Sequence, residues 1–235
     1  MDKKLDMEET NKKSQVKRIF DSISNRYDFL NHFLSAGVDL YWRNKAVKLT
    51  GMNKNSTLLD IACGTGDFAI TAKKSGVEKI FGADLSFNML SLFAHKADWI
   101  NGKIVESVAE HLPFKDNSFT NITIAFGVRN FYDIPQAFRT FHRILGKEGK
   151  VTVLEFRLPK NKLIKSFYLF YFNNILPLIG RMISNDKEAY TYLPESVGEF
   201  DQKIDLVSIF KECGFKKTER HSLTLGLTQV VIAQK

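Results

Sequence analysis

Residues 58–67, LLDIACGTGD, constrain the fold of this chain more than any other segment. An apolar stretch typical of a buried strand brings Asp60 to its end, and the turn around Gly64 and Gly66 excludes large side chains. A helix is predicted to start at Asp67. Glycine lets a ligand approach the main chain closely, and the N-terminus of a helix offers free N–H groups. The segment therefore predicts a ligand site at a strand–turn–helix junction of an α/β fold.

Two kinds of ligand are considered for this junction. Gly64, Gly66 and Ala69 match the loose dinucleotide pattern G-x-G-x-x-G/A, which is a weak signal by itself. Asp60 argues against a pyrophosphate at this place, because a carboxylate would repel it. The same carboxylate suits S-adenosylmethionine, which carries an ammonium and a sulfonium. The residues favour S-adenosylmethionine over NAD and leave both open.

A second acidic residue supports a nucleotide-type ligand. The predicted strand at residues 79–83 ends at Asp84. A carboxylate there can accept hydrogen bonds from both ribose hydroxyls, as in nucleotide-binding α/β folds generally. Both candidate ligands carry a ribose, so Asp84 does not separate them. The alternative role for Asp84 is that of a helix N-cap or a turn residue before the helix predicted over residues 87–97.

Composition limits the class of protein. The 235 residues suffice for one α/β domain, and their 44% hydrophobic and 26% charged content is ordinary for a soluble globular chain. No apolar run is long enough for a membrane-spanning helix, and the polar residues 1–14 predict a disordered tail instead of a secretory signal. Cys63 and Cys213 lie far apart without metal-ligand spacing. These features predict a reduced, cytoplasmic protein with no metal site.

The net charge of +8 raises the possibility of a nucleic-acid or anionic-membrane partner. The lysines are scattered, with loose concentrations only at residues 12–18 and 160–165, and no basic stripe interleaved with aromatic residues is present. Solvated faces explain most of this charge, and no nucleic-acid partner is predicted.

Strand and helix patterns alternate along the chain, which predicts a mostly parallel, doubly wound sheet. Strands are predicted at residues 57–62, 79–83, 102–107, 121–126, 150–156, 215–222 and 226–233, and a turn at residues 147–149. Helices are predicted at residues 16–34, 39–49, 67–75, 87–97, 135–145 and 206–212. The short link between the last two strands predicts a hairpin that adds an antiparallel strand. That ending favours the methyltransferase version of the fold over a dehydrogenase.

An ordered series of short motifs extends over most of the chain. It comprises FDSI at residues 20–23, WR at 42–43, LPF at 112–114, IAFGVRN at 124–130 and LEF at 154–156. With this series the chain closely resembles the ubiquinone/menaquinone biosynthesis C-methyltransferases over roughly residues 16–235. The resemblance implies a class I S-adenosylmethionine-dependent methyltransferase fold, which is Rossmann-like, with a mostly parallel seven-stranded sheet and an antiparallel C-terminal strand. It also implies one methyltransferase domain over residues 15–235, with N-terminal helices at residues 16–49.

The resemblance assigns S-adenosylmethionine to named residues. The implied cofactor-binding residues are Asp60, Gly64, Thr65, Gly66, Asp84, Val108 and Ala109. Thr65 would contact the cofactor at the turn, Asp60 would face the methionine ammonium and Asp84 the ribose. Val108 and Ala109 would lie beside the adenine. The family commonly has Asp or Asn where this chain has Val108, so either Glu110 compensates or the cofactor is held less tightly.

The implied reaction is the transfer of a methyl group to a ring carbon of a prenylated quinol. An electron-rich quinol is required, and loss of a ring hydroxyl proton directs electron density to the adjacent carbon. Arg129 would stabilise the developing phenolate, and Asn130 would orient the hydroxyl. The alternative for Arg129 is a salt bridge to a carboxylate such as Glu155.

The acceptor side is less constrained by the residues alone. The implied substrate contacts are Tyr27, Tyr190 and Tyr192. The group that takes the proton is left open among Tyr27, Asp28, Tyr190 and a bound water.

Residues 163–183, LIKSFYLFYFNNILPLIGRMI, are rich in aromatic residues but too interrupted to span a bilayer. They belong to an insertion at about residues 160–200 that we expect to form a lid over the acceptor. Simple core packing is one role for these aromatic residues. The other is an apolar wall for a prenyl tail, with Lys160, Lys162 and Lys165 near lipid headgroups at the inner face of the membrane.

Three hypotheses follow for the function. The favoured one is a C-methyltransferase acting on demethylmenaquinol, with the benzoquinol of the ubiquinone pathway as the alternative acceptor. The second is a methyltransferase acting on RNA or protein, and the third is an NAD-type nucleotide-binding module. The sequence also leaves a homodimer open.

Overall fold

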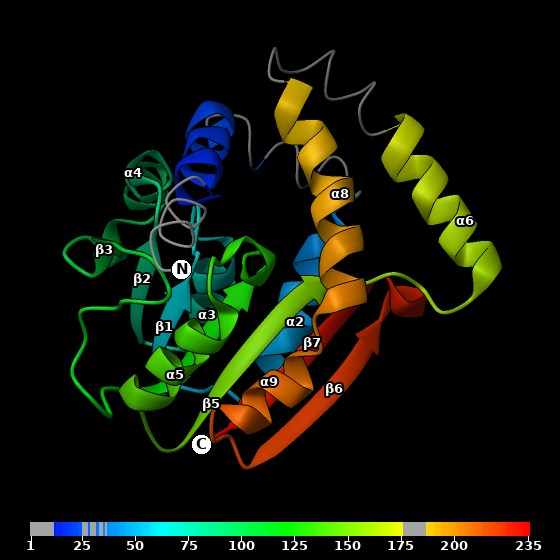
Figure 1. Ribbon diagram of the computed structural model, residues 1–235. Coiled ribbons are helices and arrows are strands. Elements are labelled where there is room, and N and C mark those ends of the chain that lie inside the picture. Colours follow the sequence, from blue (N-terminus) through cyan, green and yellow to red (C-terminus); the bar gives the residue numbers. More distant parts are fainter. Residues whose placement is uncertain (1–11, 25–27, 29–31, 33–34, 36, 176–186) are drawn as a thin grey trace, which may run out of the picture.

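The computed structural model describes residues 12–24, 28, 32, 35, 37–175 and 187–235, without the side chains of residues 173 and 187–193. Its centre is a seven-stranded sheet in the order β3-β2-β1-β4-β5-β7-β6 (Figure 1). The strands are β1 (Thr57–Ile61), β2 (Lys79–Asp84), β3 (Ile104–Glu106), β4 (Phe119–Ala125), β5 (Leu145–Phe156), β6 (Lys217–Leu223) and β7 (Thr228–Gln234). Strands β1 to β5 pair in parallel, whereas β7 is antiparallel to both β5 and β6. The predicted fold class is confirmed.

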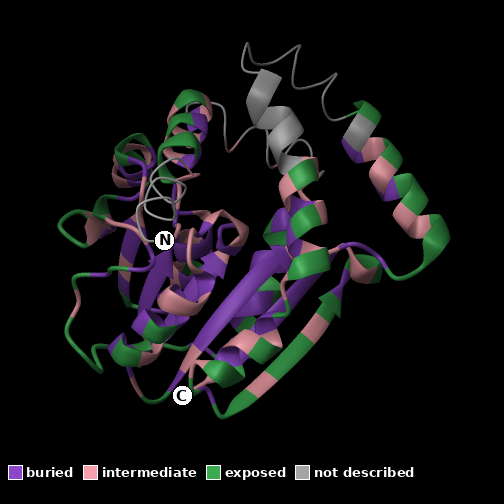
Figure 2. Cartoon of the chain, in the orientation of Figure 1, coloured by how far each residue is buried: buried purple, intermediate pink, exposed green. Residues whose placement is uncertain are grey.

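Helices cover both faces of this sheet. They are α2 (Val38–Thr50), α3 (Asp67–Lys74), α4 (Phe87–Lys96), α5 (Ile134–Ile144), α6 (Lys162–Phe170), α8 (Lys187–Lys203) and α9 (Leu206–Glu212), with shorter turns η1 (Asp98–Ile100), η2 (Val128–Asn130), η3 (Tyr171–Ile175) and η4 (Thr224–Gly226). Successive strand residues point to opposite faces, so Leu58 lies in the core beneath α2, α3 and α4, and Leu59 in the core beneath α5 and α9. Both are fully buried. Figure 2 shows the central strands of the sheet as buried and the edge strand β6 as largely exposed.

Two local predictions are corrected. The first helix covers residues 12–24, so residues 12–14 are helical and do not belong to the predicted disordered tail. Burial of Val16 and Ile19 against the body explains this, because it anchors the first turns of the helix. The turn predicted at residues 147–149 lies inside β5, where Glu148 has a φ of 62° and the pairing with β4 shifts register. The turn signal therefore marks a bulge.

The segment between β5 and α9 lies beyond the carboxyl end of the sheet. Figure 1 shows α6 standing away from the sheet, with α8 between α6 and the rest of the molecule. Within the described residues, no helix has the length and apolar character needed to cross a bilayer. This arrangement places α6, η3 and α8 beside the edge of the sheet where the predicted ligand loops lie.

Candidate active site

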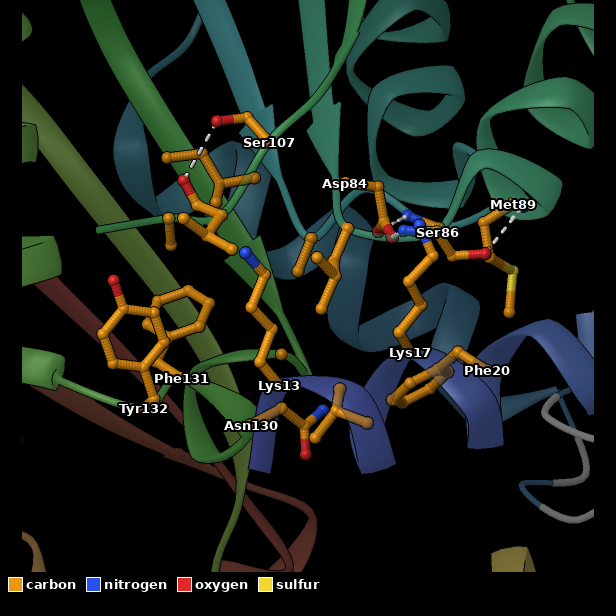
Figure 3. A pocket seen from close by; sticks show the side chains of 18 of the residues that line it. Lys13, Lys17, Phe20, Asp84, Ser86, Met89, Ser107, Asn130, Phe131 and Tyr132 are labelled. Atoms are coloured by element: carbon orange, nitrogen blue, oxygen red, sulfur yellow. Dashed lines mark hydrogen bonds between the residues drawn. The ribbon is translucent and has the colours of Figure 1, made fainter. Parts of the chain in front are cut away.

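A pocket lies at the carboxyl ends of β1, β2 and β4 (Figure 3). It encloses about 760 Å³, including solvent at its mouth. The strand order reverses direction between β1 and β4, and α/β sheets bind their ligands in the crevice outside the strand ends at such a switch point. The topology therefore positions the sequence-predicted ligand loops around one cavity.

Asp84 lies in the wall of this pocket at the end of β2. Its Oδ2 accepts a hydrogen bond from the Gly64 N–H at 2.8 Å, and its Oδ1 accepts one from the Ser86 N–H at 2.8 Å. Desolvation raises the pKa of Asp84, and these N–H donors oppose the rise. Each carboxylate oxygen has a second lone pair, so the group can still accept hydrogen bonds from ribose hydroxyls. Of the alternative roles, the helix N-cap belongs to Ser86, which accepts from the Met89 N–H, and Asp84 is a turn residue before α4 through its bond from the Ser86 N–H.

The two glycines of the turn have different reasons to be glycine. Gly64 has a φ of 53° and lines the pocket. Gly66 has a φ of 88°, and a Cβ built on it would lie 2.1 Å from a ring carbon of Phe93 on α4. Gly66 is therefore needed for the close packing of α4 on the turn.

A smaller pocket adjoins the first and shares Ala62, Gly64 and Ala125 with it. Arg43 of α2 lines it together with Asp60 and Asp67. The guanidinium pairs with Asp39 at 2.5 Å and lies 3.8 Å from Asp67. Among the described residues, neither Arg43 Nε nor Asp67 Oδ2 has a hydrogen-bond partner, although both atoms are buried. A guanidinium facing two carboxylates fits the zwitterionic end of an amino acid.

Asp60 is 1% exposed at the end of β1. Its Oδ1 accepts from the Thr123 hydroxyl at 2.7 Å, and its Oδ2 accepts from the Ala69 N–H at 3.2 Å. Burial raises the pKa of Asp60 to about 7, against the effect of these hydrogen bonds and of Arg43. A cation bound in the smaller pocket would lower this pKa again. Asp60 thus has the place that the sequence predicts for a group facing the methionine ammonium.

Thr65 lines the smaller pocket, but its hydroxyl points into a polar network. It donates to Asp28, whose carboxylate also pairs with Lys96 at 2.7 Å. Lys96 pairs in turn with Asp67 at 2.8 Å. The network ties the N-terminal region to the cofactor turn, and it commits Asp28, one of the candidate proton acceptors, to ion pairing.

The group His32, Asp39 and Asp67 has ligand atoms within 4.8 Å of one another, as in a metal site. Arg43 contacts both carboxylates of this group, so a guanidinium already fills the position of a cation. The arrangement is that of an ion-pair network.

Val108 and Ala109 line the main pocket after β3, as predicted for the adenine side. The Val108 carbonyl accepts from the Ser107 hydroxyl and from the His111 N–H, which fixes this loop. Glu110 also lines the pocket, but its Oε1 accepts from the N–H groups of Tyr132 and Asp133 at 2.9 and 3.2 Å. Glu110 therefore holds the loop after η2, and Val108 and Ala109 give this side of the pocket an apolar surface.

The helix over residues 12–24 covers the main pocket, which the sequence did not predict. Lys13, Val16, Lys17 and Phe20 line the cavity, and Figure 3 shows both lysines extending from this helix into it. Its position is held by polar contacts to the loops of the sheet. Lys17 pairs with Glu106, and Asp21 accepts a hydrogen bond from Ser86. Lys12 Nζ donates to the Phe131 carbonyl.

Arg129 and Asn130 lie in η2, directly after β4. Asn130 lines the pocket. Arg129 has a nearly buried side chain, and its Nη1 lies 2.8 Å from Glu155 Oε1 and 2.5 Å from the carbonyl oxygen of Phe126. Its Nε donates to Ser196 of α8 at 3.3 Å. The salt bridge considered as the alternative for Arg129 is formed, and it lies next to the pocket residue Phe126.

Three predicted substrate residues lie outside the described part of the structure. Tyr27 is one of the residues that are not described, and the side chains of Tyr190 and Tyr192 are not described either. Their roles stay predictions.

Comparison with known proteins agrees with this geometry. Residues 7–235 match the ubiE/COQ5 methyltransferase family. The demethylmenaquinone methyltransferase of Chlorobaculum tepidum is 40% identical, with 97% of this chain and 95% of that protein covered. The ubiquinone/menaquinone biosynthesis C-methyltransferase UbiE of Geotalea daltonii is 42% identical, with 96% and 98% covered.

Solved structures agree on the fold. A SAM-dependent methyltransferase of Thermotoga maritima, described as a possible histamine N-methyltransferase, has a TM-score of 0.64 at 18% identity and covers 93% of this chain and 99% of its own. A putative S-adenosyl-L-methionine-dependent methyltransferase of Methanococcus maripaludis has a TM-score of 0.62 at 20% identity and covers 92% and 93%. At these identities the likeness concerns the fold alone.

The two adjoining pockets fit the two ends of S-adenosylmethionine. The main pocket offers Asp84 to a ribose and an apolar surface to a base, and the smaller pocket offers Arg43 and two carboxylates to an amino acid. Of the two ligands that the turn left open, S-adenosylmethionine is confirmed as the cofactor. On these matches and this geometry, the chain belongs to the ubiE/COQ5 methyltransferase family.

Proposed function

We propose that this chain transfers a methyl group from S-adenosylmethionine to a ring carbon of demethylmenaquinol. The relatives support this acceptor, since those of Chlorobaculum tepidum, Porphyromonas gingivalis and Staphylococcus aureus are named demethylmenaquinone methyltransferases. Other relatives carry the name ubiquinone/menaquinone biosynthesis C-methyltransferase, which keeps the benzoquinol as the alternative acceptor. A homodimer stays a prediction.

The observation that carries the proposal is an aromatic series that leads from the cofactor pocket to α6. Phe126 lines the pocket, and its ring centroid lies 4.5 Å from that of Phe156 at the end of β5. Phe156 lies 6.2 Å from Phe172, and Phe172 lies 4.2 Å from Tyr168 of α6. Tilted and edge-to-face rings of this kind form an apolar wall suited to a flat aromatic ring with an isoprenoid tail.

The chemistry needs an electron-rich acceptor beside a positive charge. When bound, S-adenosylmethionine supplies an electrophilic methyl group on a sulfonium. The oxidised quinone is too electron-poor to attack it, so the acceptor is the reduced quinol, whose ring carbon gains the methyl and loses a proton. Arg129 stabilises the phenolate that develops on the quinol oxygen, and Asn130 orients that hydroxyl. Glu155 holds the guanidinium in place by the 2.8 Å ion pair.

We further propose that α6 and η3 form the acceptor lid and touch the membrane that holds the prenylated substrate. On α6, Leu163, Phe167 and Phe170 are 67%, 69% and 58% exposed. Residues 157–175 contain several lysines and no acidic residue. Exposed apolar side chains flanked by lysines fit the interface of an anionic bilayer.

Vesicle flotation tests the membrane contact. The full-length chain is expected to float with phosphatidylglycerol-containing vesicles at low salt, and the variant Phe167→Ser/Phe170→Ser is expected to lose most of this binding. Phe87→Ser is the matched control, because Phe87 is 64% exposed on α4 and lies on a different element. Equal flotation of all three proteins, or none by the wild type, would contradict the contact.

The methyl transfer itself is tested under anaerobic conditions. The purified chain is incubated with S-adenosylmethionine and chemically reduced demethylmenaquinone, and the quinone is analysed by mass spectrometry. The expected product has gained one methylene unit on the ring, and the oxidised quinone is expected to give none. Reaction of the benzoquinol alone would move the substrate to the alternative acceptor, and reaction of neither quinol would overturn the proposal.

A further inference from the structure

The hydroxyl of Tyr168 is an unusual group in this molecule. Tyr168 is 9% exposed, and its hydroxyl oxygen is buried with no hydrogen-bond partner in the described part of the chain. A buried polar group without a partner destabilises a protein by about 1–3 kcal/mol, so such groups are rare and call for an explanation.

The surroundings of Tyr168 connect it to the proposed acceptor site. Its ring packs against Phe172 with a centroid distance of 4.2 Å, which fixes the direction of the side chain. Phe172 contacts Phe156, and the Arg129 guanidinium lies 5.8 Å from the centroid of the Phe156 ring. The lid tyrosine and the Arg129–Glu155 pair therefore lie on the same short aromatic series.

The electrostatic environment of Tyr168 keeps its hydroxyl protonated, so the hydroxyl can donate a hydrogen bond. Burial raises the pKa of Tyr168, Arg129 opposes this, and the carboxylates of Glu155 and Asp201 raise it further. The group therefore keeps its proton at physiological pH, which excludes it as the base of the reaction. Glu155 also has a buried oxygen, Oε2, without a hydrogen-bond partner among the described residues.

We propose that Tyr168 is an acceptor-binding residue whose hydroxyl donates a hydrogen bond to the quinol oxygen next to the carbon that is methylated. This inference rests on the proposed quinol acceptor and names the lid's contribution to its binding. Arg129 provides the positive charge at that oxygen, and Tyr168 provides a neutral donor from the lid. The donor strengthens its bond as charge develops on the oxygen, which favours the transition state over the bound ground state.

Tyr41 offers a comparison outside the proposed acceptor lid. It lies on α2 and is 54% exposed. Tyr168→Phe and Tyr41→Phe remove the same atom from two tyrosines, only one of which belongs to the aromatic series. Tyr168→Phe also keeps the ring that packs on Phe172.

Three measurements on wild type and both variants test the inference. For Tyr168→Phe, kcat with reduced demethylmenaquinone is expected to fall about 10–100-fold, because one donor to a developing oxyanion is lost. The calorimetric affinity for S-adenosylhomocysteine is expected to stay unchanged. The Tm is expected to rise by about 2–4 °C, because an unsatisfied buried hydroxyl is removed. Tyr41→Phe is expected to change kcat less than about twofold.

A binding cycle separates this inference from the proposed function. The affinities of wild type and Tyr168→Phe are measured for the quinol and for an analogue that lacks the ring oxygen. Wild type is expected to prefer the quinol, and Tyr168→Phe is expected to lose most of that preference. An unchanged preference, an unchanged kcat or a fall in Tm would overturn the role of Tyr168 while wild-type methylation upholds the proposed function. Absence of quinol binding by wild type would overturn both.

Discussion

The cofactor half of this site and the proposed acceptor half are built differently. At the cofactor half, Asp84 and Asp60 stand at the ends of adjacent central strands, and backbone N–H groups hold their carboxylates. At the acceptor half, Arg129 and Tyr168 come from η2 and from α6, and their environment is made by side chains from β5, η3 and α8. The two carboxylates of the cofactor half are held by backbone N–H groups near the strand ends, whereas the proposed acceptor half is held by side-chain contacts between segments far apart in the chain.

Both halves contain buried polar atoms that have no hydrogen-bond partner among the described residues. Arg43 Nε and Asp67 Oδ2 face the smaller pocket as a donor and an acceptor, as an amino acid end requires. Tyr168 Oη and Glu155 Oε2 also lack partners, and Arg129 acts electrostatically on both groups. In both places the buried atoms without partners lie where a ligand is expected, which fits a site that is completed by what it binds.

The largest expected effect is a loss of stability when the buried Arg129–Glu155 ion pair of the proposed acceptor half is broken. Glu155 is fully buried and neutralises Arg129, so Glu155→Leu leaves a buried guanidinium without its carboxylate. The free energy of unfolding is expected to fall by about 3–5 kcal/mol, measured by urea denaturation. The double variant Glu155→Leu/Arg129→Met is expected to recover most of this loss.

Glu199→Leu is the control for that experiment. Its ion pair with Lys203 is exposed on both sides, so the change is expected to cost less than about 0.5 kcal/mol. A small loss for Glu155→Leu, or no recovery in the double variant, would show that the acceptor half does not depend on this pair.

The second effect concerns the pH dependence of the cofactor half. Burial raises the pKa of Asp60 to about 7, so the folded protein binds this proton more tightly than the unfolded chain does. The contribution of Asp60 to stability is therefore complete below about pH 4 and is lost as the pH rises to about 7. Asp60→Asn keeps an acceptor for the Ala69 N–H and removes the titration. Wild type loses this contribution between pH 4 and pH 7 and the variant does not. The free energy of unfolding of the variant minus that of wild type is therefore expected to rise by up to about 4 kcal/mol over this range.

Urea unfolding at several pH values measures this difference. Asp98→Asn serves as the control because it makes the same substitution at an exposed position. If the difference between Asp60→Asn and wild type does not change with pH, the raised pKa of Asp60 is contradicted.

The smallest expected effect tests whether the two pockets of the cofactor half bind different ends of the cofactor. Arg43→Gln removes the guanidinium of the smaller pocket. Binding of S-adenosylhomocysteine is expected to weaken about 10–100-fold, because one charge-assisted hydrogen bond is lost. Methylthioadenosine lacks the amino acid end, so its affinity is expected to change little. Isothermal titration calorimetry measures both ligands.

Lys48→Gln is the control on the same helix, because Lys48 is exposed in the last turn of α2. If Arg43→Gln lowers the affinity for both ligands equally, Arg43 supports the fold and does not bind the amino acid end of the cofactor.

The predictions from sequence succeeded where the signal is local. The strand–turn–helix at residues 58–67 and the acidic residue after β2 could be found because a few consecutive residues decide them. The reason for Gly66 could not be found in this way, since it is the ring of Phe93 on α4. Arg43 was noticed only as part of a motif, and no local pattern connects it with Asp67.

The mostly parallel sheet, the antiparallel ending and the place of the cofactor turn follow from hydrophobic periodicity, glycine spacing and one series of motifs, so the sequence by itself determined them. Only the tertiary structure decided that the helix at residues 12–24 covers the cofactor pocket, that Arg129 pairs with Glu155 and that Tyr168 points its hydroxyl into a buried region. The physical reason is that periodicity and turn chemistry act over a few residues, whereas burial and ion pairing join side chains that only the folded sheet brings together.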